Sequence, residues 1–528
     1  MSSTSIPAGP DPSTGLTATG RYLVIIAAFL GWFFGGTHMA INGLAMRTAA
    51  LNLLAESSQG DLSEDDRARI ASLSVKLDFD KDGVIQTTAF DNPQVQDGLN
   101  PGQIGRKELQ QVGLTKNPDV VKVLGIAGDQ DGVISDAELE RYVIDDRLGP
   151  LAGRWFGYYI CAFLFGAALG GLVFGRIGDR FGRVKGMAAA ITCYSAMSLL
   201  AYFFAQSPGQ LLVARFITCM GVGGMWPNGV ALMSEAWEGV SRPMLAGVIG
   251  TAANVGIFLT FWLGRQVEVD YDSWRWVLLV GGSPIVLAVF VIALVPESPK
   301  WLADRRRFLT ADEPLLELEH PAIKTSTWEV FRPGLLGVTL VGILLATVPL
   351  LGGWGASSWA QPWADKVGAE IGNPSLKAEI GMARSLTGIV GSFLGGIIAS
   401  IVGRKKTYFL TSLCCLACAE YVYFFHTPDQ WQFLAGFAAL GFFSGIFFGW
   451  LPLFLPELFV TRMRSTGGGV CFNFGRILTA FTVFAGSILI ARFNEDYALL
   501  GRIMSLIYLV GAIGICLMPA GVGGEIED

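Results

Sequence analysis

The sequence predicts an all-α membrane protein: a bundle of about twelve transmembrane helices in two six-helix halves, with a small helical domain inserted after the first span. The 528 residues are 52% hydrophobic and only 16% charged, and the apolar residues fall in long runs. A helix needs about 20 mostly apolar residues to cross the roughly 30 Å hydrocarbon core. Because lipid offers the backbone no hydrogen-bond partners, each such run must be a helix.

The apolar runs place the spans in order along the chain. The predicted spans are 22–44, 155–174, 187–204, 211–233, 244–264, 274–295, 334–361, 376–402, 407–425, 430–456, 465–491 and 497–520. The first run is too long for a cleaved signal peptide and no basic segment precedes it, so we expect it to be retained. The predicted domains are a disordered tail (1–20), the first helix with an extension (21–56), the insert (57–148), the rest of the first half (149–295), a linker (296–333), the second half (334–521) and a short tail (522–528).

Basic residues predict the orientation, because Lys and Arg concentrate on the cytoplasmic side of a membrane. With the amino terminus inside, the basic clusters at 176–185, 305–307, 404–406 and 462–464 all face the cytoplasm. We therefore expect a monomer in the cell (inner or plasma) membrane, with both termini and the linker in the cytoplasm and the insert outside it.

A repeat divides the spans into two halves. Glu235 and Arg242 stand at the junction of the fourth and fifth spans, and Glu457 and Arg464 stand at that of the tenth and eleventh. Both pairs are seven residues apart, and Glu457 follows Glu235 by 222 residues. Parallel halves of this kind are typical of transporters whose substrate site lies between the halves.

Four segments match motifs of one transporter family: GRIGDRFGRVK at 175–185, RFITCMGVGG at 215–224, VPESPKWL at 295–302 and PELFVTRMRSTGGG at 456–469. They resemble the major facilitator superfamily, in particular its sugar porters, organic anion transporters and metabolite:proton symporters. The resemblance implies the major facilitator fold. The chain departs from the family pattern at Ser400, where Asp is usual, and at Val460, where Pro is usual.

The resemblance also implies a network of ion pairs at the cytoplasmic ends of the helices. These charges would pair while the cytoplasmic side is closed and separate when it opens. Static pairing at helix ends, or contact with lipid headgroups, is the alternative. The predicted gating residues are Asp179, Arg183, Glu235, Arg242, Glu297, Arg404, Glu457 and Arg464.

Arg476 is the most informative polar residue within a span. It follows Arg464 by twelve residues, about 18 Å along a helix, which places it near the middle of the membrane. In the organic anion transporters of the amphiphilic solute group, an Arg at this spacing after the R-x-T-G-x-G motif faces the cavity. A permanently charged guanidinium there would bind a carboxylate. A structural Arg that pairs with a helix end or with backbone carbonyls is the alternative.

Other polar and aromatic residues within spans complete the predicted substrate site, because polar groups are costly to bury in a membrane. His38 and Asn42 lie one turn apart on the same face of the first span. Tryptophans at such positions stack on an organic solute or lie at the membrane interface. The remaining candidates are Asn228, Asn254, Trp354, Trp359, Arg384, Trp450 and Asn473.

The energy coupling stays open. Proton-coupled members of the family with a similar first span often read W-F-F-D-G-F/Y-D there, whereas residues 32–38 of this chain read WFFGGTH, without a carboxylate. If a proton is transported, His38 is the expected carrier because its pKa lies near neutral pH. A hydrogen-bonded packing histidine is the alternative, so symport, exchange and facilitated diffusion all remain possible.

The insert holds 18 acidic and 10 basic residues, and two of its segments fit the calcium-binding loop of the EF-hand. The first loop has Ala89 at position 12, where Glu is usual, and the second has Ala127 at position 1, where Asp is usual. An Ile at position 8 of each loop favours a paired EF-hand fold, with calcium binding or a purely structural pair as the two interpretations. The predicted ligands are Asp78, Asp80, Asp82, Val84 and Gln86 in the first loop and Asp129, Asp131, Val133, Ser135 and Glu138 in the second.

These observations predict a secondary active or facilitative transporter that moves a small organic solute, first of all an organic anion, by alternating access. A sugar or neutral-solute porter and a non-transporting, calcium-responsive receptor on the same scaffold are the alternatives. No segment resembles a nucleotide-binding loop or a catalytic triad, so we expect neither an enzyme nor an ATP-driven pump. The expected partners are the solute and the lipid bilayer, with no nucleic acid and no nucleotide or redox cofactor.

Overall fold

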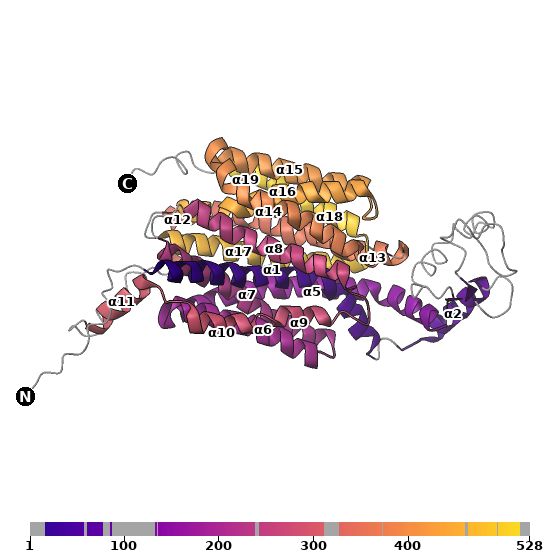
Figure 1. Ribbon diagram of the computed structural model, residues 1–528. Coiled ribbons are helices and arrows are strands. Elements are labelled where there is room, and N and C mark those ends of the chain that lie inside the picture. Colours follow the sequence, from indigo (N-terminus) through magenta and orange to yellow (C-terminus); the bar gives the residue numbers. More distant parts are fainter. Residues whose placement is uncertain are drawn as a thin grey trace, which may run out of the picture.

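In the computed structural model, long helices run side by side in a bundle, and a smaller lobe projects from one end of it (Figure 1). By the lobe we mean helix α2 (Glu64–Leu77) and the start of helix α5 (Asp136–Phe181). The structure describes residues 16–57, 61–77, 85–86, 133–134, 136–237, 242–310, 327–371, 373–459, 463–493 and 495–517. Helix α1 begins, and helix α19 ends, at the end of the bundle opposite the lobe (Figure 1). We call that end the termini end and the end that carries the lobe the insert end.

Six membrane-crossing segments form the first half. They are α1 (Ala18–Ala55), α5 (Asp136–Phe181), α6 (Arg183–Phe204), α7 (Pro208–Ala236), α8 (Arg242–Gln266) and the pair α9 (Trp276–Gly282) and α10 (Ile285–Leu294). The last segment is interrupted at Pro284, which has no N–H to donate to the preceding turn. The linker that follows contains α11 (Pro299–Thr310) and the short helix η4 (Thr327–Phe331).

The second half repeats this arrangement. Its segments are α12 (Pro333–Leu351) continued by η5 (Gly352–Ala356), η6 (Ser357–Trp359) and α13 (Ala360–Ile371), then α14 (Leu376–Val402), α15 (Arg404–Phe425), α16 (Trp431–Glu457), α17 (Arg464–Arg492) and the pair α18 (Tyr497–Ser505) and α19 (Ile507–Cys516). Ten segments are long and apolar enough to cross a membrane, judged by length and composition alone. Helices α7 and α8, of 29 and 25 residues, complete twelve within the described residues. The predicted two-half helical bundle is confirmed.

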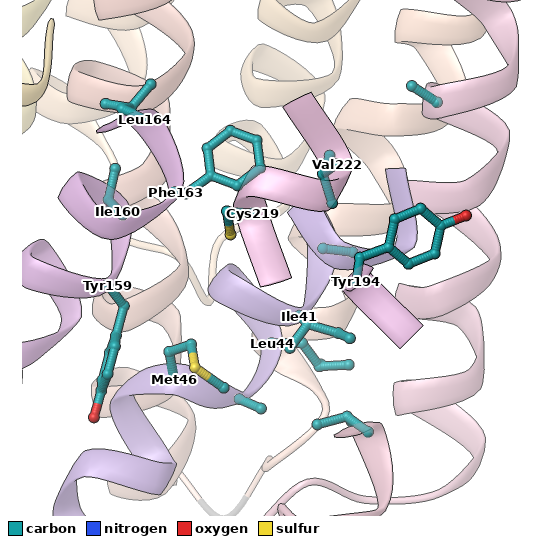
Figure 2. Close-up of a cluster of buried hydrophobic side chains, with 14 of the residues drawn as sticks. Ile41, Leu44, Met46, Tyr159, Ile160, Phe163, Leu164, Tyr194, Cys219 and Val222 are labelled. Atoms are coloured by element: carbon teal, nitrogen blue, oxygen red, sulfur yellow. The ribbon is translucent and has the colours of Figure 1, made fainter. Parts of the chain in front are cut away.

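Each half has its own packing, and the halves meet along two seams. Helices α5 and α6 pack on α7 in the first half, and α14 and α15 pack on α16 in the second. The seams join α8 to α14 and α5 to α17. Figure 2 shows part of the core of the first half, where Ile41 and Leu44 of α1 lie among side chains of α5, α6 and α7.

The structure describes only part of the insert, namely residues 61–77, 85–86 and 133–134 and the start of α5. Helix α2 (Glu64–Leu77) packs against α5, and strand β1 (Ile85–Gln86) pairs with β2 (Val133–Ile134) in antiparallel register. The register sets Ile85 opposite Ile134, the two residues at position 8 of the predicted loops. The predicted ligands Asp78, Asp80, Asp82, Val84, Asp129, Asp131 and Ser135, and the side chains of Gln86, Val133 and Glu138, lie outside the described residues. The EF-hand fold and calcium binding therefore stay predictions.

The close approach of α5 and α7 gives a test of the packing. A methyl group at Gly223 would overlap the backbone of α5 at Ala167, whereas one at Gly337 would meet no atom within 4 Å. Overpacking of this kind costs about 1–3 kcal/mol. We expect Gly223→Ala to lower the melting temperature of the purified protein and Gly337→Ala to leave it unchanged or slightly higher. Equal melting temperatures for the two variants would contradict the described packing.

Candidate functional site

A cavity of about 180 Å³ lies between the two halves. Residues of α1, α5, α7 and α8 line it from the first half, and residues of α12–α14, α16 and α17 line it from the second. The cavity therefore lies where both halves can contact one solute molecule, the position expected of a transporter's substrate site.

Two arginines are the charged residues of the cavity lining. Arg476 Nη1 donates to Asn473 Oδ1 at 3.4 Å, and its guanidinium lies 4.8 Å from the centre of the Phe472 ring. Arg384 Nε is buried without a hydrogen-bond partner. Among the described residues, no carboxylate pairs with either arginine, and the lining contains no Asp or Glu. Two positive charges thus line the cavity without a counter-charge.

The rest of the lining is largely apolar, with eight aromatic residues, and includes a few amides and hydroxyls. The aromatic lining residues are Trp32, Phe156, Phe163, Trp226, Phe261, Trp354, Phe448 and Phe472, and the uncharged polar ones are Asn42, Asn254, Ser358, Gln361 and Ser444. Asn254 Nδ2 of α8 also donates to Ser392 Oγ of α14 at 2.9 Å, across a seam between the halves. Aromatic faces suit a flat organic body, and guanidinium groups suit a carboxylate.

His38 does not line the cavity. His38 is fully buried, and Arg215 of α7 donates through Nη2 to the His38 carbonyl oxygen at 2.9 Å and to Asn42 Oδ1 at 3.0 Å. Arg215 Nη1 also lies 3.5 Å from His38 Nδ1, so a proton on the imidazole would face the positive guanidinium. This geometry fits the packing interpretation of His38. The partner, Arg215, lies inside a motif segment of the sequence but was not predicted to contact the first span.

The remaining substrate-site candidates divide into two groups. Asn42, Asn254, Trp354, Arg384 and Arg476 line the cavity, and Asn473 contacts it through Arg476. Asn228, Trp359 and Trp450 do not line it, which corrects the prediction for these three.

Their environments explain the correction. Asn228 Nδ2 donates to the backbone oxygens of Phe174 and Gly224, both at 2.9 Å, and thereby joins α7 to α5. The Trp359 ring lies beside Phe156 and Tyr497, and the Trp450 ring lies beside Tyr408 and Phe454. Buried polar and aromatic groups that satisfy packing look the same in a sequence as those that face a solute.

The predicted gating residues lie at the termini end and pair within one half. In the first half, Arg183 pairs with Asp179 and its Nε lies 3.9 Å from Glu235 Oε1. Glu297 Oε1 accepts the backbone N–H of Arg183 at 2.9 Å.

In the second half, Arg404 Nη2 pairs with Glu457 Oε1 at 2.8 Å, which joins α15 to α16. The side chains of Arg242 and Arg464 lie outside the described residues. Each ion pair described at the termini end therefore holds helices of the same half together.

A second group of charges, which the sequence did not reveal, joins the two halves at the insert end. We call Arg47, Asp365, Lys366, Lys377 and Glu495 the insert-end charge cluster. Arg47 Nη1 of α1 donates to Asp365 Oδ2 of α13 at 2.9 Å, and its Nη2 lies 3.4 Å from Glu495 Oε1. Lys377 Nζ binds Asp365 Oδ1 at 2.6 Å, and Lys366 Nζ binds Glu495 Oε2 at 2.9 Å.

Most of the cluster is buried, with Lys366 the most exposed member, and the cluster also reaches uncharged groups of the first half. Lys377 Nζ donates to Thr48 Oγ1 at 3.0 Å and to the Val269 carbonyl oxygen at 2.7 Å. The side chains of Arg47, Glu495 and Lys377 are 10, 8 and 3% exposed. Removing one partner of such a buried pair leaves an uncompensated charge and costs about 3–5 kcal/mol.

The position of the cluster relates it to the cavity. Gly43 and Gln361 line the cavity at the insert end, and a Cβ atom at Gly43 would lie 3.0 Å from Gln361 Cγ. Arg47 and Asp365 follow these two residues by one helical turn on the same helix faces. The paired charges therefore lie one helical turn beyond the cavity, toward the insert end.

Comparisons with known proteins agree with this architecture. Residues 120–327 match the family model "Sugar (and other) transporter". A putative metabolite transport protein of Haemophilus influenzae is 27% identical over 73% of this chain and 90% of its own length. A cis,cis-muconate transport protein of Acinetobacter baylyi is 26% identical over 60% of this chain and 73% of its own length.

Among solved structures, a D-xylose-proton symporter aligns with a TM-score of 0.58 and 14% identity over 94% of this chain and 99% of that one. This similarity shows the fold. The motifs, the two six-helix halves and the cavity between them agree with it, so the chain has the fold of the major facilitator transporters and is similar to metabolite transport proteins.

Proposed function

We propose that the protein transports an organic anion and binds its charged group with Arg384 and Arg476. The observation that carries the proposal is the pair of guanidinium groups in the cavity lining, which have no carboxylate partner among the described residues. A charge inside a membrane protein is costly unless it is paired, and an anionic solute would supply the missing partner. The relative named for cis,cis-muconate, an organic anion, supports this choice.

The insert-end charge cluster supports alternating access. On α1, no residue from Gly35 to Leu54 is exposed, so the part of the helix on the insert side is packed all round. If the insert lies outside the cytoplasm, as the basic loops predict, the structure is the state closed to the outside. Breaking the cluster would then admit the solute from that side.

A sugar or neutral-solute porter is the second candidate. The family model that matches residues 120–327 is named for sugars, and the similar solved structure is a xylose symporter. A neutral solute would leave Arg384 and Arg476 without a counter-charge, which makes it the less favourable cargo for this cavity.

Substitution of the two cavity arginines separates these candidates. A hydrogen bond to a charged group contributes about 1.5–3 kcal/mol, so Arg476→Gln and Arg384→Gln should each weaken binding of an organic anion by about 10- to 100-fold. Arg476→Lys keeps the charge and should retain part of the affinity, and Arg67→Gln, at an exposed position on α2, should change nothing. The measurement is uptake of radiolabelled aromatic and aliphatic carboxylates, with hexoses in parallel, into proteoliposomes. Carboxylate uptake unaffected by Arg476→Gln would refute the proposal, and hexose uptake alone would favour the second candidate.

We also propose that the insert binds calcium. The observation that favours it is the pairing of Ile85 with Ile134, because paired EF-hand loops contact each other at position 8. Each loop lacks one main ligand, so we expect weak binding, with a Kd of about 10⁻⁴–10⁻³ M as in extracellular sites. Calcium titration of the full-length protein by calorimetry should give this affinity, and Asp78→Ala with Asp129→Ala should abolish it. A parent protein that binds no calcium at 10 mM (about ten times the weakest expected Kd) would contradict the proposal.

A further inference from the structure

The insert is attached to the membrane part by ion pairs as well as by the chain. Arg147 of α5 donates through Nη1 to Asp66 Oδ2 of α2 at 2.6 Å and through Nη2 to the Asp61 carbonyl oxygen at 3.2 Å. A second pair, Arg69 to Asp146, measures 2.9 Å. Helix α2 is thus fixed to α5 at two adjacent residues of α5.

Asp66 is the better buried partner of these pairs, with a side chain that is 10% exposed. Burial alone would raise the pKa of its carboxyl group, but hydrogen bonds from Ser63 and the positive charge of Arg147 hold the pKa below its usual value. Asp66 is therefore ionised at neutral pH, and its contact with Arg147 is a charge-assisted hydrogen bond.

Apolar residues are also buried on both helices of this attachment. Leu73 of α2 is buried, as are Leu139, Tyr142 and Val143 on the part of α5 that precedes the membrane span. The Arg69 guanidinium lies 5.5 Å from the centre of the Tyr142 ring. Because α2 also lies against α5, the attachment is more than a single surface ion pair, and we treat α2 and the start of α5 as one unit.

Helix α5 connects this unit directly with the insert-end charge cluster. The helix continues without a break from Asp136 to Phe181, from the lobe into the bundle (Figure 1). Two residues after Arg147, a Cβ atom at Gly149 would lie 3.0 Å from Glu495 Oε2, and one turn later a Cβ atom at Gly153 would lie 2.9 Å from the Tyr497 hydroxyl oxygen.

Glu495 and Tyr497 both contact Arg47 at the insert end. The Tyr497 hydroxyl donates to Glu495 Oε1 at 3.0 Å, and Arg47 Nε lies 3.4 Å from the same hydroxyl. Pro150, between the two glycines, gives no backbone hydrogen bond, so α5 bends more easily here than elsewhere. A shift of α2 on α5 would therefore move the backbone that lies against Glu495.

We propose that attachment of the insert to α5 controls closure of the cavity at the insert end. The Asp66–Arg147 pair holds Gly149 against Glu495 and so favours the state in which the insert-end charge cluster is formed. The inference rests on the proposed alternating-access transport, and it makes the insert a regulator of that transport. Loosening α2 from α5 shifts the protein toward the state open at the insert end, whatever the solute.

The test measures opening at the insert end rather than transport. Thr48 lies between the halves and is 6% exposed, so a thiol introduced by Thr48→Cys should react slowly with a membrane-impermeant maleimide in nanodiscs. Arg147→Gln should speed that reaction by about threefold to fivefold, the effect of losing one partly exposed ion pair. Arg147→Lys should restore the slow rate, and the matched control Arg67→Gln, on the exposed face of α2, should leave it unchanged. The rate of the protein with Thr48 intact is subtracted to remove native cysteines.

Glu495→Gln in the same background is the reference for opening, and a melting curve checks that each variant is folded. Faster labelling in both Arg147→Gln and Glu495→Gln supports the inference. Faster labelling in Glu495→Gln with no change in folded Arg147→Gln overturns it and leaves the charge cluster as the closure. No change in either variant overturns both the inference and the role of the charge cluster in closing the cavity. The proposal that the protein transports an organic anion is tested separately, by the uptake of carboxylates.

Discussion

Buried opposite charges at the insert end are the interaction on which the rest of the structure depends. Three cations and two carboxylates from both halves meet there, and the Val269 carbonyl oxygen and the Thr48 hydroxyl satisfy the remaining donors of Lys377. The net free energy of such a cluster is small, because the cost of removing charges from water offsets much of their attraction. A closure made of charges can therefore hold two halves in one arrangement and still open by hydration, within the few kcal/mol that separate two populated states.

Arginine side chains have a different role in the cavity. Arg47 has two carboxylates within ion-pair distance, whereas Arg384 and Arg476 have none among the described residues. A guanidinium that has carboxylate partners stabilises a contact between helices. A guanidinium that has none can bind an anion from outside the protein. The position of the paired cluster one helical turn beyond the cavity connects closure with solute binding.

The fold and part of the site could be predicted from the sequence because their signals are local. Apolar runs mark helices, and the spacing of Arg464 to Arg476 along one helix places the latter in the membrane. The insert-end cluster could not be predicted in this way. Arg47 and Asp365 are 318 residues apart, and nothing in the sequence near either one indicates its partner. For the same reason the sequence does not reveal that Arg215 contacts His38, or that Asn228 and Trp450 lie outside the cavity lining.

The central claim is that the insert-end charge cluster holds the two halves together on that side. Spin labels introduced by Val267→Cys, after α8 in the first half, and Ile371→Cys, at the end of α13 in the second, sit at exposed positions at the insert end. Electron–electron double resonance in nanodiscs should give one short distance for the parent and, on addition of Glu495→Gln, a second and longer population. Identical distance distributions for the two proteins would contradict the account.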